Sequence, residues 1–463
     1  MGATRREFAQ LVGAGLAPVG GAKAATNSAS GPPRPNIVYI HSHDSGRYLR
    51  PYGHDVPTPN LMRLARQGVL FRQAHCASPG CSPSRAALLT GQAAHSSGML
   101  GLAHLGWGLH DYRQHLLHTL RGHGYRSVLA GLQHIAKDPR AIGFDEMLPH
   151  RSDHASDVSP VAARYILSRP KQPFFLDVGF FETHRDFPDP VDNPDYILPP
   201  SPMPDNSRTR IDMAGFHASA RQMDKGVGRV LDALDKAELA SNTLVLSTTD
   251  HGIAFPDMKC NLLDGGTGVS MIMRGPGVFS QPGMCDALIS QIDVFPSLCE
   301  YLQIETPAWV QGRSFLPILR GETAQINDAV YGEVTYHASY QPMRSVRTER
   351  WKYIRRFDGR TAPNLPNCDD GASKAFWVKE GWRQQPVAPE ELYDLVFDPA
   401  EKDNLIAAER TRQVAQDMRQ RLDAWMKRTG DPLLKGPVPL PPHGLAVDPN
   451  ALSPEALRGT IKG

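Results

Sequence analysis

Residues 173–181 read Pro-Phe-Phe-Leu-Asp-Val-Gly-Phe-Phe, an almost continuous apolar run. Such a run is typical of a β-strand buried on both faces, as in a parallel sheet covered by helices. Residues 36–41 (Asn-Ile-Val-Tyr-Ile-His) and 243–250 (Thr-Leu-Val-Leu-Ser-Thr-Thr-Asp) have the length and β-branched content of two more buried strands. Together these runs predict the centre of a large sheet.

Further strands and helices alternate around this centre. We expect strands at 69–71, 126–131 and 269–275, and helices at 58–68, 116–122, 212–237 and from 292 onward. Alternation of this kind indicates an α/β fold, in which a mostly parallel sheet is sandwiched by helices. We assign residues 36–328 to this large domain.

The pattern changes after about residue 329. Residues 343–356 indicate two antiparallel strands around a turn, and 411–428 have the spacing of an amphipathic helix. Between them, 364–389 is rich in turn residues and predicts a long loop. We therefore expect a smaller C-terminal α+β subdomain over 329–463.

Composition excludes several classes of protein. The chain has 463 residues, of which 41% are hydrophobic and 21% charged, as in ordinary globular proteins and unlike disordered or multi-span membrane proteins. Its 50 basic and 48 acidic residues give a net charge of +2, so no basic field favours a nucleic-acid partner. Six cysteines are too few for a disulfide scaffold.

The N-terminus resembles an export signal. Arg5 and Arg6 precede Phe8 and a weakly apolar Gly/Ala-rich stretch, a pattern typical of bacterial twin-arginine signals, and Ala22-Lys23-Ala24 fits a cleavage site. We predict a signal peptide over 1–24, a linker over 25–35, and a periplasmic or secreted protein without a membrane span in its mature form. The export partner would be the twin-arginine machinery; the alternative is a basic helix of a cytosolic protein.

The clearest chemical motif is Cys81-Ser82-Pro83-Ser84-Arg85, which continues to Thr90-Gly91. Ser82 can cap a helix, Pro83 suits its first turn and Gly91 can end it. Residue 81 would then face free backbone N–H groups at the positive end of the helix, where oxyanions bind. Arg85 could reach back to it. The alternative is a structural cysteine before a well-capped helix.

This motif resembles the signature of the type I, formylglycine-dependent sulfatases, and the resemblance extends over about 36–410. It implies an alkaline-phosphatase-like fold and the oxidation of Cys81 to 3-oxoalanine (formylglycine) by a formylglycine-generating enzyme. The hydrate of that aldehyde would be the nucleophile, and Arg85 would stabilise the hydrate and the sulfate.

The resemblance also implies a metal site. His43-Asp44 matches the first metal-binding strand of the family, where Asp-Asp is usual, and Asp250-His251 matches the second metal pair. Residue 81 would complete the ligand set. Carboxylates suit Ca²⁺, but His43 departs from the family pattern, and two imidazoles also suit Mn²⁺ or Zn²⁺.

Three more residues match catalytic positions of the family. His134 would act on the formylglycine, His184 lies in the segment near the leaving group, and Lys259 falls where a sulfate-binding cation is usual. Leu132 stands where the family commonly has a lysine, so one sulfate-binding cation is missing or replaced. His95 is a candidate for supporting the nucleophile.

Several segments are most similar to the N-sulfoglucosamine sulfohydrolases (heparan N-sulfatases). In that subfamily the region of His337 and Arg344 would help to shape the sugar pocket. Trp107, Trp377 and Trp382 could stack on sugars or serve only packing. The expected substrate is a sulfated saccharide, with the N-sulfate of glucosamine in heparan-type glycans as the main hypothesis.

Other functions stay open from the sequence. The first is another sulfatase, such as a 6-O-type glycan sulfatase or an arylsulfatase. The second is a phosphonate or phosphate monoester hydrolase of the same superfamily, and the third is an inactive protein that binds sulfated glycans. The sequence leaves the oligomeric state open, with a homodimer as one alternative.

Overall fold

The computed structural model describes residues 34–456 and 461–462. The predicted signal peptide and most of the predicted linker lie outside these residues. Residues 34–463 group as one compact unit, so the domain boundary near 329 stays a prediction. In the described residues, no helix combines the length and the apolar character needed to cross a membrane.

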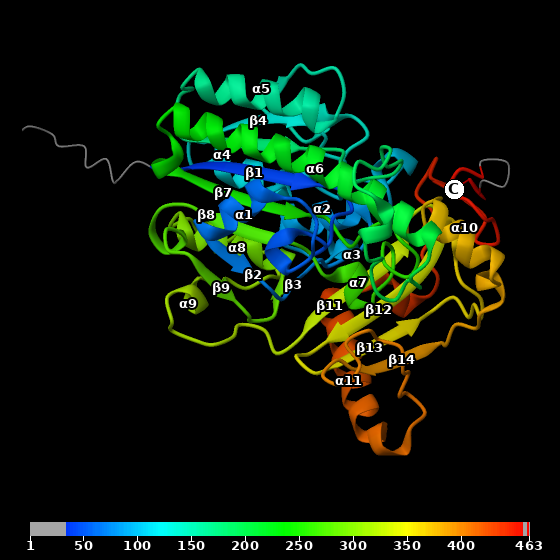
Figure 1. The fold of residues 1–463 in the computed structure, drawn as a ribbon. Helices are drawn as coiled ribbons and strands as arrows, with labels where there is room; N and C mark the ends of the chain where they lie inside the picture. The colour runs from blue at the N-terminus through cyan, green and yellow to red at the C-terminus, as the bar shows by residue number, and fades with distance from the viewer. Residues whose placement is uncertain (1–33, 457–460, 463) are drawn as a thin grey trace, which may run out of the picture. The chain divides into compact units, whose positions relative to one another are not determined.

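Within the described residues, eight strands form one sheet in the order β5-β4-β6-β1-β7-β8-β2-β9 (Figure 1). Their bounds are β1 Asn36–Ser42, β2 Val69–Phe71, β4 Arg126–Gly131, β5 Glu146–Leu148, β6 Phe174–Gly179, β7 Thr243–Thr249, β8 Met271–Arg274 and β9 Gly283–Cys285. The pairs from β5 to β7 are parallel, and β8 runs antiparallel to both its neighbours. The three central runs of the sequence therefore form neighbouring strands, as predicted.

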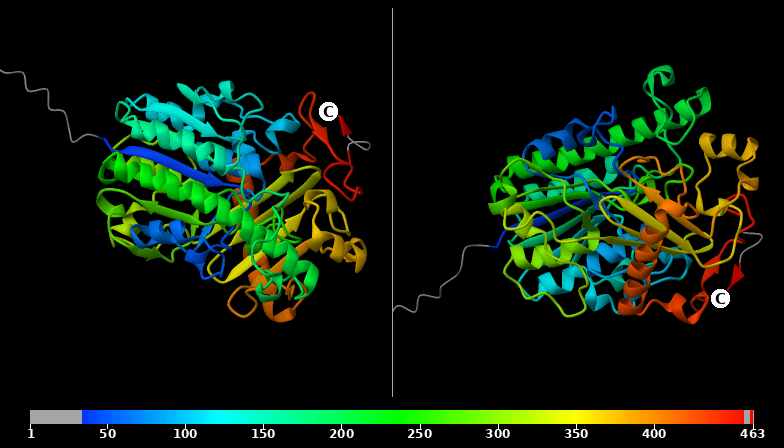
Figure 2. Two further views of the ribbon diagram at one scale, coloured as in Figure 1. Left: turned by 45° about the horizontal axis from the view of Figure 1, so that its top comes forward. Right: turned by 90° about the horizontal axis from the view of Figure 1, so that it is seen from below.

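Helices cover both faces of this sheet (Figure 2). One face packs against α1 (Pro59–Arg66), α5 (Ala155–Leu167) and α6 (Ser207–Lys236). The other packs against α2 (Cys81–Thr90), α4 (Leu116–Arg121) and α8 (Val294–Tyr301). All seven residues of β1 are buried, as expected for a strand between two helical layers. The predicted α/β sandwich is confirmed.

Two helix starts differ from the predictions. α2 begins at Cys81 with Gly80 in the cap position, and the Ser82 hydroxyl instead accepts a hydrogen bond from the Ala103 backbone N–H at 3.0 Å. α6 begins at Ser207, earlier than predicted, because Asn206 and Thr209 form a reciprocal capping box. Gly91 ends α2 at φ 67°, as its position in the sequence predicts.

A second sheet has the order β11-β12-β13-β14. Its strands are β11 Val330–Tyr336, β12 Tyr340–Arg347, β13 Trp351–Arg356 and β14 Glu390–Asp394, all antiparallel. Helix α11 (Arg412–Thr429) packs against β12 and β13. The predicted long loop over 364–389 is wrong in part, because α10 (Ala372–Lys379) forms within it. In Figure 1 this second sheet lies beside the carboxyl ends of the central strands of the large sheet.

Candidate active site

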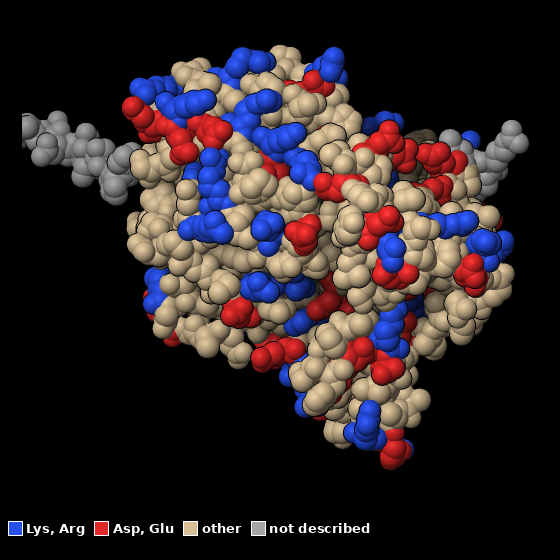
Figure 3. All heavy atoms as spheres, in the orientation of Figure 1, with Lys and Arg blue, Asp and Glu red and all other residues tan. Residues whose placement is uncertain are grey.

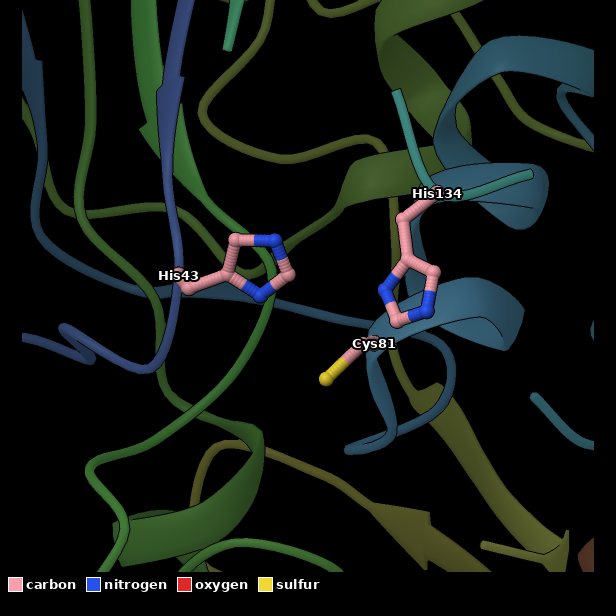
Figure 4. A group of neighbouring side chains, drawn as sticks. All are labelled: His43, Cys81 and His134. Atoms are coloured by element: carbon pink, nitrogen blue, oxygen red, sulfur yellow. The ribbon is translucent and has the colours of Figure 1, made fainter. Parts of the chain in front are cut away.

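Cys81 is the first residue of α2 and is almost fully buried. Its Sγ lies 3.4 Å from His251 Nε2 and 4.0 Å from Asp44 Oδ1. Burial raises the pKa of the Cys81 thiol well above its usual value, and the nearby Lys259 opposes this rise only in part. Figure 4 shows the Cys81 sulfur in the space between the rings of His43 and His134.

Arg85 lies one turn into α2 and points back to the ends of β1 and β7. Its guanidinium donates to the Ser42 carbonyl at 2.8 Å and to Asp250 Oδ2 at 2.9 Å, and it also contacts His41 Nδ1. His41 Nδ1 must accept this bond, so its Nε2 donates to Asp177 Oδ1 at 2.8 Å. Burial lowers the pKa of Arg85, but Asp250 outweighs that effect and raises it. Arg85 is thus a fixed cation beside residue 81.

A group of donor atoms fits a divalent cation. One ligand atom each of His43, Asp44, Cys81 and Asp250 lies within 4.8 Å of the others. His251 Nε2 is 3.3 Å from Asp44 Oδ1 and 3.7 Å from Asp250 Oδ2. Burial raises the pKa of Asp250, but His251 and Arg85 outweigh it and hold the value well below the usual range. His43, Asp44, Asp250 and His251 follow the carboxyl ends of the adjacent parallel strands β1 and β7, where open α/β sheets bind ligands.

The Lys259 ammonium contacts two carboxylates and one imidazole. Its Nζ lies 2.8 Å from Asp44 Oδ2, 2.7 Å from Asp369 Oδ2 and 3.2 Å from His184 Nε2. His184 Nδ1 donates to the Arg185 carbonyl at 2.6 Å, so its Nε2 is the acceptor that faces Lys259. Burial lowers the pKa of Lys259, but Asp369 and Asp44 outweigh that effect and raise it well above its usual value.

His134 lies on the other side of Cys81 from His43. Its ring stacks on His104 with a centroid separation of 5.4 Å, and its Nε2 lies 3.1 Å from His104 Nδ1. Burial, followed by the neighbouring His104, lowers the pKa of His134 to about 3. Its Nδ1 has no hydrogen-bond partner among the described residues, so this nitrogen is available to a ligand at residue 81.

His337 is the one residue of the predicted sugar pocket that lies near this group. It is buried, and a Cβ placed on Gly80, just before Cys81, would lie 3.6 Å from its Cδ2. Neither ring nitrogen of His337 has a hydrogen-bond partner within residues 34–456. Burial, and then the charge of Lys259, hold the pKa of His337 well below its usual value.

Arg344 and His95 do not join the site. The Arg344 guanidinium donates to Asp431 Oδ2 at 2.5 Å and to the Val334 carbonyl at 2.8 Å, and it lies 3.5 Å from Glu333 Oε2. His95 Nδ1 is 3.0 Å from the same Glu333 carboxylate. Burial raises the pKa of Glu333, but His95 and Arg344 outweigh it and lower the value to about 2. The role predicted for Arg344 in sugar binding does not fit this placement, and neither does support of the nucleophile by His95.

Two cavities flank the site. Leu132 lines a cavity of about 340 Å³ together with His104, His134 and Lys137. Trp377 and Trp382 line another of about 570 Å³ that reaches Lys259. Trp107 packs on Tyr336 with a ring separation of 5.1 Å, so it serves packing.

The sequence alone did not identify three neighbours of the site. Asp369 lies in a turn-rich segment, and nothing in its local pattern links it to Lys259. His104 is likewise isolated in the sequence. His41 had a signal, because it lies near the carboxyl end of a buried strand, two residues before His43.

The sulfatase family model matches residues 35–304, more than half of the chain. The chain therefore belongs to the sulfatase family, whose members hydrolyse sulfate esters or sulfamates. A second model, described as N-sulphoglucosamine sulphohydrolase, C-terminal, matches residues 257–367. The predicted family and the predicted hydrolase class are confirmed.

Individual relatives agree with this assignment. Human N-sulphoglucosamine sulphohydrolase is 27% identical over 466 aligned residues, covering 87% of this chain and 92% of that protein. An ulvan-active sulfatase of Formosa agariphila is 28% identical, covering 92% of this chain and 89% of its own. A sulfatase structure in complex with D-glucosamine-2-N,6-O-disulfate superposes with a TM-score of 0.68 at 17% identity, covering 87% of this chain and 99% of its own, which shows the shared fold.

Proposed function

We propose that this sulfatase releases the N-sulfate of glucosamine residues in heparan-type glycans. The observation that carries the substrate assignment is the match of the N-sulphoglucosamine sulphohydrolase C-terminal model to 257–367, a segment that includes Lys259 and His337. The human relative with that activity in its name is similar over most of both chains. The proposed substrate partner is therefore a sulfated saccharide.

Conversion of Cys81 to formylglycine is part of the proposal. Its support is the position of residue 81 at the start of α2, beside Arg85 and the proposed metal ligands. Once a formylglycine-generating enzyme has acted, residue 81 would offer a hydrated aldehyde as the nucleophile. His43, Asp44, Asp250, His251 and residue 81 would hold a cation, which would supply positive charge for the sulfuryl oxygens.

The chain's own residues divide the remaining work. Arg85 and Lys259 offset the negative charge that develops on the transferring group. His184 Nε2 accepts from Lys259 at 3.2 Å, and once it has taken up a proton from Lys259 or from solvent it is placed to pass that proton to the leaving nitrogen. His134, whose Nδ1 is unpaired among described residues, accepts a proton from the hydroxyl at residue 81. His337 contacts the sugar next to the start of α2.

A second candidate is hydrolysis of a sulfate ester on another polysaccharide. The ulvan-active relative, similar over 92% of this chain, favours it. Because residue 132 is not a lysine, a phosphonate or phosphate monoester is a further alternative substrate.

We also propose that the protein is exported by the twin-arginine route to the periplasm or the medium. Arg5 and Arg6 support this proposal.

The test begins with the protein co-expressed with a formylglycine-generating enzyme. Peptide mass mapping over residue 81 establishes the conversion, and sulfate release is then measured from N-sulfoglucosamine, glucosamine 6-sulfate and an aryl sulfate, with a phosphonate monoester alongside. Release from the sulfamate alone, absent in Cys81→Ser, is expected. Turnover of an ester alone moves the assignment to the second candidate. Conversion without any turnover contradicts the enzymatic proposal.

A further inference from the structure

We propose that the cation of this site is a first-row transition-metal ion that binds imidazole, such as Zn²⁺ or Mn²⁺, and not Ca²⁺. This inference rests on the proposed function in one respect, the presence of a divalent cation beside residue 81. It concerns the ligands that this chain itself offers, which are two imidazoles and two carboxylates beside residue 81.

His43 is the first reason. Its ring is 1% exposed, and neither Nδ1 nor Nε2 makes a hydrogen bond to any described residue. Nδ1 lies 3.2 Å from Asp250 Oδ2, without hydrogen-bond geometry. A buried polar group that has no partner destabilises the folded protein. A metal ion bound to one of these nitrogens removes that destabilisation.

His251 is the second reason, because its tautomer is fixed by its surroundings. Nδ1 lies 2.9 Å from the Gly252 carbonyl, which can only accept, so Nδ1 carries the proton. The lone pair of Nε2 then points toward Asp44 Oδ1 at 3.3 Å and Cys81 Sγ at 3.4 Å. A histidine that donates one N–H to a backbone carbonyl and offers the other nitrogen is the usual arrangement of a metal ligand.

The carboxylates supply the third reason, because they offer too few oxygens for Ca²⁺. Asp44 Oδ2 is bound to Lys259 at 2.8 Å. Asp250 Oδ1 accepts the backbone N–H groups of Asp44 and His251 at 2.8 and 2.9 Å, and its Oδ2 accepts from Arg85. Neither carboxylate is free to bind through both oxygens.

With the oxygen of residue 81, the protein therefore provides three oxygens and two imidazole nitrogens. Ca²⁺ takes about 6–8 oxygen ligands. Zn²⁺ and Mn²⁺ accept nitrogen ligands beside oxygen. The two positive charges of Arg85 and Lys259 beside the two carboxylates further weaken a site that would depend on anionic oxygen alone.

The experiment counts bound metal and needs no turnover. Cys81→Ser protein is used, because an unconverted thiol would itself attract soft metals. The protein is stripped with a chelator and equilibrated with equal concentrations of Zn²⁺, Mn²⁺ and Ca²⁺ in pairs, and bound metal is measured by plasma mass spectrometry. We expect one transition-metal ion per chain, bound about tenfold or more tightly than Ca²⁺. Equal or preferential binding of Ca²⁺ overturns the inference.

The double variant His43→Asp/His251→Asn restores an oxygen-rich ligand set in the same background. It should bind Ca²⁺ more tightly and Zn²⁺ more weakly than its parent, whereas His54→Asn, an exposed histidine outside the site, should change neither. Unchanged selectivity in the double variant contradicts the inference.

If the double variant does not fold, the parent with Co²⁺ gives an independent answer. Two paramagnetically shifted, exchangeable imidazole N–H proton signals are expected in its NMR spectrum, and their absence contradicts the inference. Because none of these measurements uses a sulfated substrate, an error in the proposed substrate leaves the result intact.

Discussion

The buried Lys259 and the partly buried Asp369 form an ion pair of 2.7 Å that joins the two sheets of the molecule. Lys259 follows β7 of the large sheet and also contacts Asp44, whereas Asp369 lies between β13 and β14 of the second sheet. Burial raises the pKa of Asp369, but Lys259 and His184 outweigh it and hold the value far below the usual range. The second sheet thereby sets the position of a cation in the active site.

Asp369→Asn should lower kcat/KM for sulfate release about tenfold to a hundredfold, because Lys259 loses one of the two carboxylates that fix the position of its ammonium. The rates are measured by ion chromatography of released sulfate. Asp370→Asn is the matched control, since Asp370 pairs with Lys374 and not with Lys259. Equal losses of kcat/KM in both variants would show that the effect comes from disturbing this loop and not from the contact between Asp369 and Lys259.

Arg85→Lys should lower kcat about a hundredfold while the protein stays folded. Lysine keeps the charge but cannot contact Ser42 O and Asp250 at once, as the guanidinium does. Initial rates and a thermal melt are the measurements. The control is Arg63→Lys, because Arg63 lies on α1 and pairs with Asp232 of α6. Full activity in Arg85→Lys would remove Arg85 from the proposed mechanism.

His134→Asn should lower kcat by about 10²–10⁴, the usual contribution of an acid–base group. His104→Asn should cost much less, because His104 only stacks on His134 and contacts its Nε2. Single-turnover rates separate this effect from product release. A larger loss for His104 than for His134 would reverse the assignment of the two roles.

Lys137→Ala should raise KM severalfold with little change in kcat. Lys137 is exposed and lines the same cavity as His134 and Leu132, so it can attract an anionic substrate where the family lysine is missing. The effect should shrink as salt is added, because exposed charges are screened. Lys171→Ala, exposed on another loop, provides the comparison. A change in kcat alone would argue against this role.

Glu333→Gln should weaken the dependence of the free energy of unfolding on pH in the acidic range. The Glu333 pKa is lowered from 4.5 to about 2 in the folded protein, so its carboxylate contributes stability that is complete above about pH 4.5 and is lost as the pH falls toward 2. We expect the variant to lose about 3 kcal/mol at neutral pH and to show a weaker pH dependence below 4.5 in urea unfolding. Glu322→Gln, at an exposed pair, should behave like the parent.

Local patterns predicted the parts of the fold that are themselves local. The central runs at 36–41, 173–181 and 243–250 became β1, β6 and β7 because buried strands of a parallel sheet must be apolar throughout. The proposed ligand pairs at 43–44 and 250–251 were expected from the resemblance to the sulfatases, and they lie together because the carboxyl ends of adjacent parallel strands meet. Helix α10 was not predicted because it lies within a segment rich in turn residues. Its sequence is Ala-Ser-Lys-Ala-Phe-Trp-Val-Lys.

Long-range partners were not predictable in the same way. Arg344 lies in a segment that resembles a sugar-binding region, yet the fold brings Asp431 and Glu333 to its guanidinium and leaves it buried. Asp369 meets Lys259 only because the second sheet is placed against the first. No spacing along the chain encodes either contact, because both depend on how two separate sheets pack.

The pairing of β1 with β7 has a practical consequence. Ser42 lies opposite Thr249 in the parallel register, and the proposed ligands follow directly on both strands. A slip by one residue would turn alternate side chains to the opposite face and separate His43 and Asp44 from Asp250. At saturating metal, occupancy of the proposed site would then report the fraction of molecules whose central strands are correctly paired, so metal stoichiometry would serve as a quality measure for the recombinant protein before any substrate is at hand.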